Sequence, residues 1–167
     1  MHPTELESKQ LLAQCQVQRI TRGGPGGQHR NKTASAVVLK HLPTGIVAEA
    51  NERRDQSVNL QRAIFRLRVQ LALEIRSKRS REPSTLWKSR CHRGRIALDP
   101  AHADFPRMLA EALDVVEQLG GDTQQAATEL GCSTTQLVKL LSMDGRAMAL
   151  LNAGRQTRGL KPLKARD

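Results

Sequence analysis

The sequence predicts an α+β protein: a small mixed or antiparallel sheet with a glycine-rich loop and a covering helix, followed by an all-helical module with a helix-turn-helix. Three observations lead to this fold class. Short β-branched and apolar runs flank the glycines of residues 23–28, called the glycine loop below. Apolar residues then recur at helical spacing from Leu60, and further helical stripes begin at Phe105 and Thr123. The chain of 167 residues can bury a core without metal or disulfide support.

The first two elements are predicted to be a short helix and a strand. Thr4 and Glu7 have the spacing of a capping box, which predicts a helix that continues through about Ala13. Residues 15–18 alternate between apolar and polar side chains with period two. This alternation predicts a strand that enters the glycine loop.

A hairpin and its covering helix are predicted next. Residues 36–41 and 46–50 are β-branched or apolar, and the Leu42-Pro43-Thr44-Gly45 segment between them favours a type I turn. From residue 60 onward, apolar residues occupy one helical face and arginines lie elsewhere, which predicts an amphipathic helix over the sheet. Its apolar positions are Ala63, Ile64, Leu67, Leu71 and Ile75.

A basic linker is predicted between the sheet and the helical module. Residues 76–95 have no clear period and contain Pro83 and Gly94, which interrupt regular structure. We therefore expect a loop or linker that lies on an anionic surface. Trp87, the single tryptophan of the chain, is expected to anchor this segment to a core.

The helical module is predicted to contain a helix that ends at Gly120-Gly121 and then a helix-turn-helix over residues 123–142. In the second pattern, Ala127, Gly131 and Leu137 stand where a small contact residue, a tight turn and a core anchor are needed, and Ser133 with Gln136 forms a capping box. The predicted organisation is a glycine-loop domain at 1–80, a basic linker at 81–99, the helical module at 100–154 and a basic tail at 155–167.

The charge is distributed unevenly along the chain. Residues 1–95 hold 19 Lys and Arg against 7 Asp and Glu, a net charge of +12. Residues 96–153 hold 3 against 8, a net charge of −5, and residues 154–167 hold 5 against 1, a net charge of +4. The first part and the tail are therefore expected to bind a polyanion.

The glycine loop allows three interpretations. A phosphate-binding loop is disfavoured, because Asn31 rather than glycine precedes Lys32. A flexible connector is disfavoured by the strand-like flanks. The third interpretation starts from Gln28, whose carboxamide neither titrates near neutral pH nor acts as a nucleophile. It can offer a backbone N–H and orient water, while Gly26 and Gly27 permit close approach to another backbone, so the loop suits a site supplied largely by a partner.

The residues around this loop carry a family resemblance. Gly26-Gly27-Gln28, with Gly24 before it and Asn31, Ser35, Val37 and residues 41–45 after it, resembles the catalytic domain of class I peptide chain release factors over about residues 10–80. The resemblance implies that the loop enters the ribosomal peptidyl transferase centre. There the Gln28 N–H stabilises charge on the developing oxyanion, the side chain positions water, and the peptidyl-tRNA ester is hydrolysed. It also implies N-methylation of Gln28 by a glutamine methyltransferase.

The implied partners are the large ribosomal subunit, through its rRNA, and peptidyl-tRNA, with no cofactor. Full-length relatives carry a stop-codon-reading domain and are about twice this length, which points to the codon-independent type that rescues stalled ribosomes. Two alternatives remain: an RNA- or ribosome-binding quality-control factor with a non-catalytic loop, and, less favoured, a DNA-binding helix-turn-helix regulator. The residues expected to bind RNA are Arg22, His29, Arg30, Lys32, Arg53, Arg54, Arg155, Arg158, Lys161 and Lys164.

Other classes of site and location find little support in the sequence. The cysteines Cys15, Cys91 and Cys132 are odd in number and widely spaced, so neither a disulfide framework nor a metal site is expected. The polar start of the chain and the absence of a long apolar run predict a cytoplasmic protein that is neither exported nor inserted in a membrane. We expect a monomer.

Overall fold

The computed structural model describes residues 1–21, 35–80 and 82–164, which belong to two compact units. One unit, Pro3–Leu71, is called the sheet unit. The other contains Met1–His2 and Ala72–Asp167 and is called the helical unit. The boundary between them falls within one helix, α3 (Gln56–Glu74). The boundary between the two units, after Leu71, lies before the predicted end of the first domain at residue 80.

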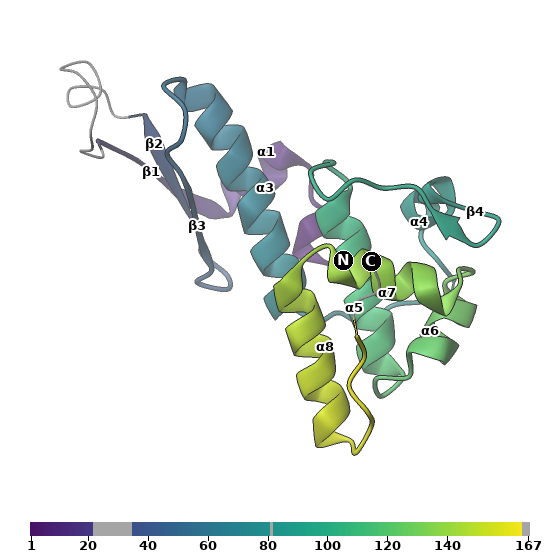
Figure 1. The fold of residues 1–167 in the computed structure, drawn as a ribbon. Coiled ribbons are helices and arrows are strands. Elements are labelled where there is room, and N and C mark those ends of the chain that lie inside the picture. Colours follow the sequence, from purple (N-terminus) through teal and green to yellow (C-terminus); the bar gives the residue numbers. More distant parts are fainter. Residues whose placement is uncertain (22–34, 81, 165–167) are drawn as a thin grey trace. The chain divides into compact units, whose positions relative to one another are not determined.

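The sheet unit confirms the α+β class (Figure 1). Its sheet is antiparallel in the order β1-β2-β3, with Val17 opposite Leu39 and Leu39 opposite Ala48. The strands lie at, or within two residues of, the predicted positions. The elements are a 3₁₀ helix η1 (Pro3–Glu5), α1 (Ser8–Ala13), β1 (Cys15–Ile20), β2 (Ala36–His41), β3 (Val47–Ala50) and α3.

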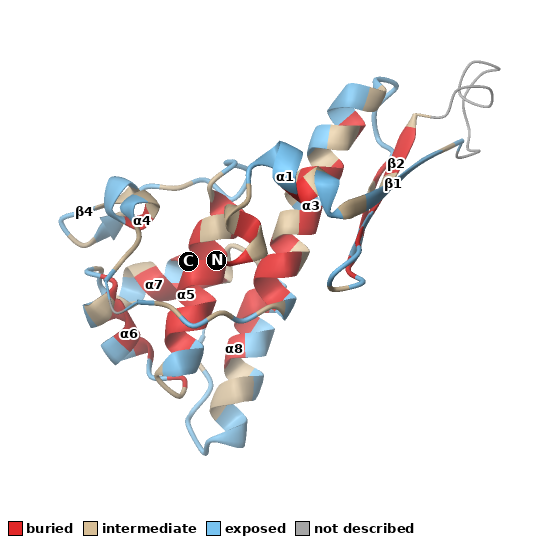
Figure 2. Cartoon of the chain, turned by 180° about the vertical axis from the view of Figure 1, so that it is seen from behind, coloured by how far each residue is buried: buried red, intermediate tan, exposed pale blue. Residues whose placement is uncertain are grey.

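One face of the sheet and one face of α3 form the core of the sheet unit. Val37 and Leu39 lie on the same face of β2 by register and are fully buried. On α3, Ala63, Leu67 and Leu71 recur every fourth residue and are also fully buried, and Figure 2 shows this buried stripe along the helix. The predicted apolar stripe is therefore the packing face. α3 begins four residues earlier than predicted.

The hairpin turn between β2 and β3 differs in detail from the prediction. The His41 carbonyl accepts hydrogen bonds from the N–H groups of Thr44 and Gly45, so the turn begins one residue earlier than predicted. Gly45 has φ +74°, a conformation that glycine adopts at low cost. The buried His41 ring contacts Thr44 Oγ1 at 2.8 Å and Gln14 Oε1 at 3.0 Å. Burial lowers the pKa of His41, which therefore serves the hairpin as a neutral structural group.

The predicted capping box near the N-terminus is wrong. Thr4 lies within η1, and its side chain is buried. α1 instead begins after Glu7, which forms a capping box with Gln10. The reason is that Pro3–Glu5 forms a separate short 3₁₀ helix, so α1 begins only after the next residue that can cap it, Glu7.

The helical unit packs its helices around α5 (Phe105–Gln118), which is buried along most of its length (Figure 2). Gly120 and Gly121, with φ +63° and +85°, follow its end as predicted. Leu137, Leu140 and Leu141 of α7 (Thr134–Ser142) complete the core. The other elements are α4 (Thr85–Arg90), β4 (Cys91–His92), β5 (Arg95–Ile96), α6 (Thr123–Glu129), α7 (Thr134–Ser142) and α8 (Gly145–Thr157).

Residues 76–95 are not simply a loop, which corrects the expectation from the sequence. Ser84 caps α4 by accepting a hydrogen bond from the N–H of Trp87, and a two-stranded hairpin, β4–β5, follows. Trp87 is fully buried, and its indole Nε1 donates to the Leu130 carbonyl at 2.7 Å. The expected role of Trp87 as an anchor is therefore confirmed.

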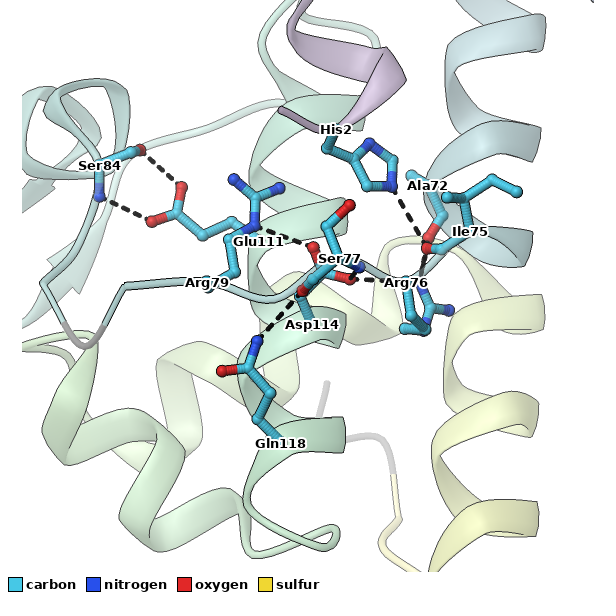
Figure 3. A network of polar contacts seen from close by, with 10 residues as sticks. All are labelled: His2, Ala72, Ile75, Arg76, Ser77, Arg79, Ser84, Glu111, Asp114 and Gln118. Carbon is cyan, nitrogen blue, oxygen red and sulfur yellow. Dashed lines mark hydrogen bonds and ion pairs between the residues drawn. The ribbon is translucent and has the colours of Figure 1, made fainter. Parts of the chain in front are cut away.

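Two buried carboxylates of α5 hold the chain that leads to α4 (Figure 3). Asp114 accepts hydrogen bonds from the Ser77 N–H at 3.1 Å and from Arg79 Nε at 2.8 Å. Glu111 accepts from the N–H of Ser84 at 2.7 Å and from its hydroxyl at 2.6 Å. Two carboxylates of this chain itself thus hold the part of the basic segment that precedes α4.

Candidate functional site

The described part of the candidate site is the stem from which the glycine loop extends. Ile20 of β1 pairs with Ala36 of β2 as the last pair of the ladder. The antiparallel register therefore holds the two ends of the intervening segment side by side. The predicted site residues Arg22, Gly26, Gly27, Gln28, His29, Arg30 and Lys32, together with Asn31, lie outside the described residues.

One buried side chain, Asn59 near the start of α3, connects this stem to a neighbouring segment. Its Nδ2 donates to the Ser35 carbonyl at 2.7 Å and to the Arg53 carbonyl at 2.8 Å. Its Oδ1 accepts from the Arg53 N–H at 3.0 Å. Asn59 is fully buried, so both amide hydrogens and the carbonyl are used inside the protein. Asn59 thereby holds both Ser35, next to the stem, and the segment between β3 and α3 at the N-terminal end of α3.

That segment carries two of the predicted RNA-binding residues. Arg53 and Arg54 are exposed, while Asn59 fixes the Arg53 backbone beside the Ser35 carbonyl. Asp55 follows and caps α3: its carboxylate accepts from the hydroxyl and the N–H of Ser57, which lower the pKa of Asp55. The stem and an exposed arginine pair are therefore adjacent.

The four predicted RNA-binding residues near the C-terminus belong to the other unit. α8 runs to Thr157, so the predicted tail begins inside a helix. Arg155 donates to the carbonyls of Gly121 and Lys161, and Arg158 pairs with Glu117 at 2.6 Å. These two arginines are thus engaged within the helical unit. Lys161 and Lys164 are exposed.

Asn59 was missed by the sequence interpretation, although a signal for it exists. Asn59, Ala63, Leu67 and Leu71 follow one another at intervals of four, so the asparagine occupies the apolar face of the helix. A polar residue at a core position needs internal hydrogen-bond partners. Its partners, however, come from segments that only the fold brings together.

Replacing Asn59 by alanine is expected to loosen the stem. The change removes three part-buried hydrogen bonds and takes this partner away from the backbone groups of Ser35 and Arg53, so the free energy of unfolding should fall by about 2 kcal/mol. Hydrogen exchange of the Arg53 amide should become faster. The control is Asn51→Ala, because Asn51 is exposed. An unchanged exchange rate at Arg53 in the Asn59 variant would contradict the role given to Asn59.

Metal and thiol chemistry have no site in the described ranges. No cluster of three or more His, Cys, Asp or Glu suited to a metal ion occurs among residues 1–21, 35–80 and 82–164. Burial, and secondarily the neighbouring Cys91, raises the pKa of Cys132 to about 12. Burial also raises the pKa of Cys15 and Cys91, so all three thiols stay protonated at neutral pH. No helix in the part of the chain that the structure describes has the length and apolarity of a membrane span.

Comparison with known proteins identifies a related family. The model of the RF-1 domain matches residues 7–98, which include the sheet unit's strands, α3, α4 and the β4–β5 hairpin. Peptide chain release factor 1 of Verminephrobacter eiseniae is 43% identical over 76 residues, which are 46% of this chain and 21% of that protein. Peptide chain release factor 1 of Carboxydothermus hydrogenoformans is 33% identical over 133 residues, 74% of this chain and 36% of that protein. The chain thus spans about a fifth to a third of the length of these relatives.

Proposed function

This chain belongs to the class I peptide chain release factor family, and on that premise we propose that it promotes codon-independent hydrolysis of peptidyl-tRNA on stalled ribosomes. The family match over residues 7–98 is the observation that carries the proposal, because it includes Gly26-Gly27-Gln28 and the strands on both sides. The ordered stem and the exposed Arg53 and Arg54 support it. Such a protein acts in the cytoplasm, on the large ribosomal subunit.

The proposed reaction is attack of water on the ester that joins the peptide to tRNA. The water oxygen bonds to the ester carbonyl carbon, and the bond from that carbon to the terminal ribose oxygen of the tRNA breaks. A proton from the water passes to the ribose oxygen. Gln28 contributes its backbone N–H to the developing oxyanion and its carboxamide to the positioning of water. Ribosomal RNA supplies much of the remaining site, and no cofactor is needed.

The other residues in the proposal hold the loop in place. Arg22, His29, Arg30 and Lys32 bind RNA around the loop, and Arg53 and Arg54 bind phosphates beside its stem. At the other end of the chain, Lys161 and Lys164 bind RNA through exposed side chains, together with Arg155 and Arg158. A glutamine methyltransferase modifies Gln28. Codon independence is part of this proposal, and peptide release on ribosomes with and without a stop codon tests it.

Peptide release from three ribosomal complexes tests this function. Purified protein is added to ribosomes that hold labelled peptidyl-tRNA with a stop codon, a sense codon or no codon in the decoding site. Release should be independent of a stop codon and should be fastest on the complex without a codon. Gly27→Ala is the control and should bind but release little, since a side chain obstructs close approach of the backbone. Release that requires a stop codon would contradict codon independence. Binding without release would instead favour the non-catalytic quality-control factor.

A further inference from the structure

The turn between α6 and α7 and the start of α7 form hydrogen bonds with residues 87–96 of the same chain. Trp87 donates to the Leu130 carbonyl, and the Gly94 carbonyl accepts from the Ser133 N–H at 3.2 Å. The Gln136 side chain accepts from the Ile96 N–H at 3.1 Å and so does not complete the predicted capping box with Ser133. In DNA-binding helix-turn-helix proteins, the N-terminal residues of the second helix contact the bases. Here the corresponding end of α7 supports the β4–β5 hairpin.

The hairpin, not α7, carries the concentrated positive charge. Residues 91–96 contain Arg93 and Arg95 and no Asp or Glu, and Lys88 and Arg90 lie just before them in the last turn of α4, whereas Lys139 is the single cation of α7. Arg90 pairs with Asp104 at 2.6 Å. Arg93 and Arg95 are exposed, and no carboxylate among the described residues forms an ion pair with either of them. Two guanidinium groups are therefore available on this hairpin.

The backbone of Arg93 gives an independent reason to ascribe a function to it. Arg93 has φ +48° and Gly94 has φ +75°, and together they form the two-residue connection between β4 and β5. Positive φ at both central positions is the geometry for which Asn-Gly, Asp-Gly or Gly-Gly is preferred. An arginine there reduces stability relative to glycine. Backbone strain of this kind clusters at functional positions.

We propose that the β4–β5 hairpin is an RNA-binding element that holds RNA phosphates through Arg93 and Arg95. The choice of RNA as the polyanion rests on the proposed function. A lipid surface is disfavoured because the described residues of α4, β4 and β5 include no exposed large hydrophobic side chain that could enter a bilayer interface. Arginine suits phosphate because its planar guanidinium can donate two parallel hydrogen bonds. The helix-turn-helix then acts as the support of this hairpin.

Arg93→Gly in the full chain separates this role from a structural one. Glycine adopts positive φ more readily, so the midpoint of thermal unfolding should rise while RNA affinity falls. Arg93→Lys should keep most of the affinity, because it keeps the charge. Binding is measured with a 30-nucleotide RNA hairpin and with large ribosomal subunits over a range of salt concentrations. For Arg93→Gly/Arg95→Gln, the magnitude of the slope of log affinity against log salt should decrease by about 1.5.

A matched control removes the same charge elsewhere in the helical unit. Lys78→Ala/Lys139→Ala deletes two exposed cations that, among the described residues, form no ion pair, and it should leave the slope nearly unchanged. An equal decrease in both double variants would overturn the proposal, as would an unchanged slope in the hairpin variant. The proposal would also be overturned if Arg93→Gly/Arg95→Gln lost binding to polyglutamate or to anionic vesicles while its RNA binding stayed intact. If the wild-type protein releases no peptide but the slope decreases as expected, the proposed function fails and the hairpin proposal stands.

Discussion

Replacing Gln28 by proline is expected to lower the rate of peptide release from stalled ribosomes by a factor of about 10² to 10³, the usual loss when one oxyanion donor is removed. Proline has no backbone N–H, so this variant lacks the group that we propose to stabilise the developing charge. Gln28→Ala keeps the N–H and removes only the carboxamide. It is therefore expected to release peptide more slowly than wild type but faster than the proline variant.

The measurement must separate chemistry from binding. Release is followed at saturating factor concentrations, and affinity for the same ribosomes is measured by co-sedimentation. An interaction made only in the transition state lowers kcat and kcat/KM together and leaves ground-state binding unchanged. If the proline and alanine variants release peptide at the same rate, the backbone N–H has no special role. If both release as fast as wild type, the catalytic assignment of the loop is wrong.

Replacing Asp114 by asparagine is expected to lower the free energy of unfolding of the helical unit by about 3 to 5 kcal/mol, the range for breaking a buried ion pair on one side. The Asp114 side chain is fully buried, and that of Arg79 is only 14% exposed. Arg76 lies 3.8 Å away, so the variant leaves two arginines without this counter-charge. Asparagine has nearly the same shape as aspartate, so the loss reports charge rather than packing.

The protein carries its own probe for this measurement. Trp87 is the single tryptophan and is fully buried in the helical unit, so its fluorescence during urea unfolding follows that unit. Glu117→Gln is the control on the same helix. Glu117 pairs with Arg158, and the two side chains are 51% and 36% exposed. The control should therefore change stability by less than about 1 kcal/mol. Equal losses in the two variants would show that burial of Asp114 has no energetic consequence.

Local patterns were sufficient to predict much of the fold. β2 and the end of α5 lie where the β-branched and apolar run of residues 36–41 and Gly120-Gly121 placed them, because apolar runs and turn residues act within a few positions. The same patterns located the helices on both sides of Gly131. Failures occurred where two local signals competed, as in the choice between Thr4 and Glu7 as the cap of the first helix.

The sequence by itself therefore determined the α+β class, the periodic elements, the division of charge and the family resemblance of the glycine loop. Only the tertiary structure decided what residues 76–95 become. Their stabilising partners are distant in sequence: Trp87 bonds 43 positions away, and Arg79 pairs 35 positions away. Asn59 likewise reaches Ser35 across 24 positions. Such contacts join residues that only folding brings together, and they produce no periodic pattern in the sequence. A basic run that looks like a linker in the sequence can therefore fold into a helix and a hairpin.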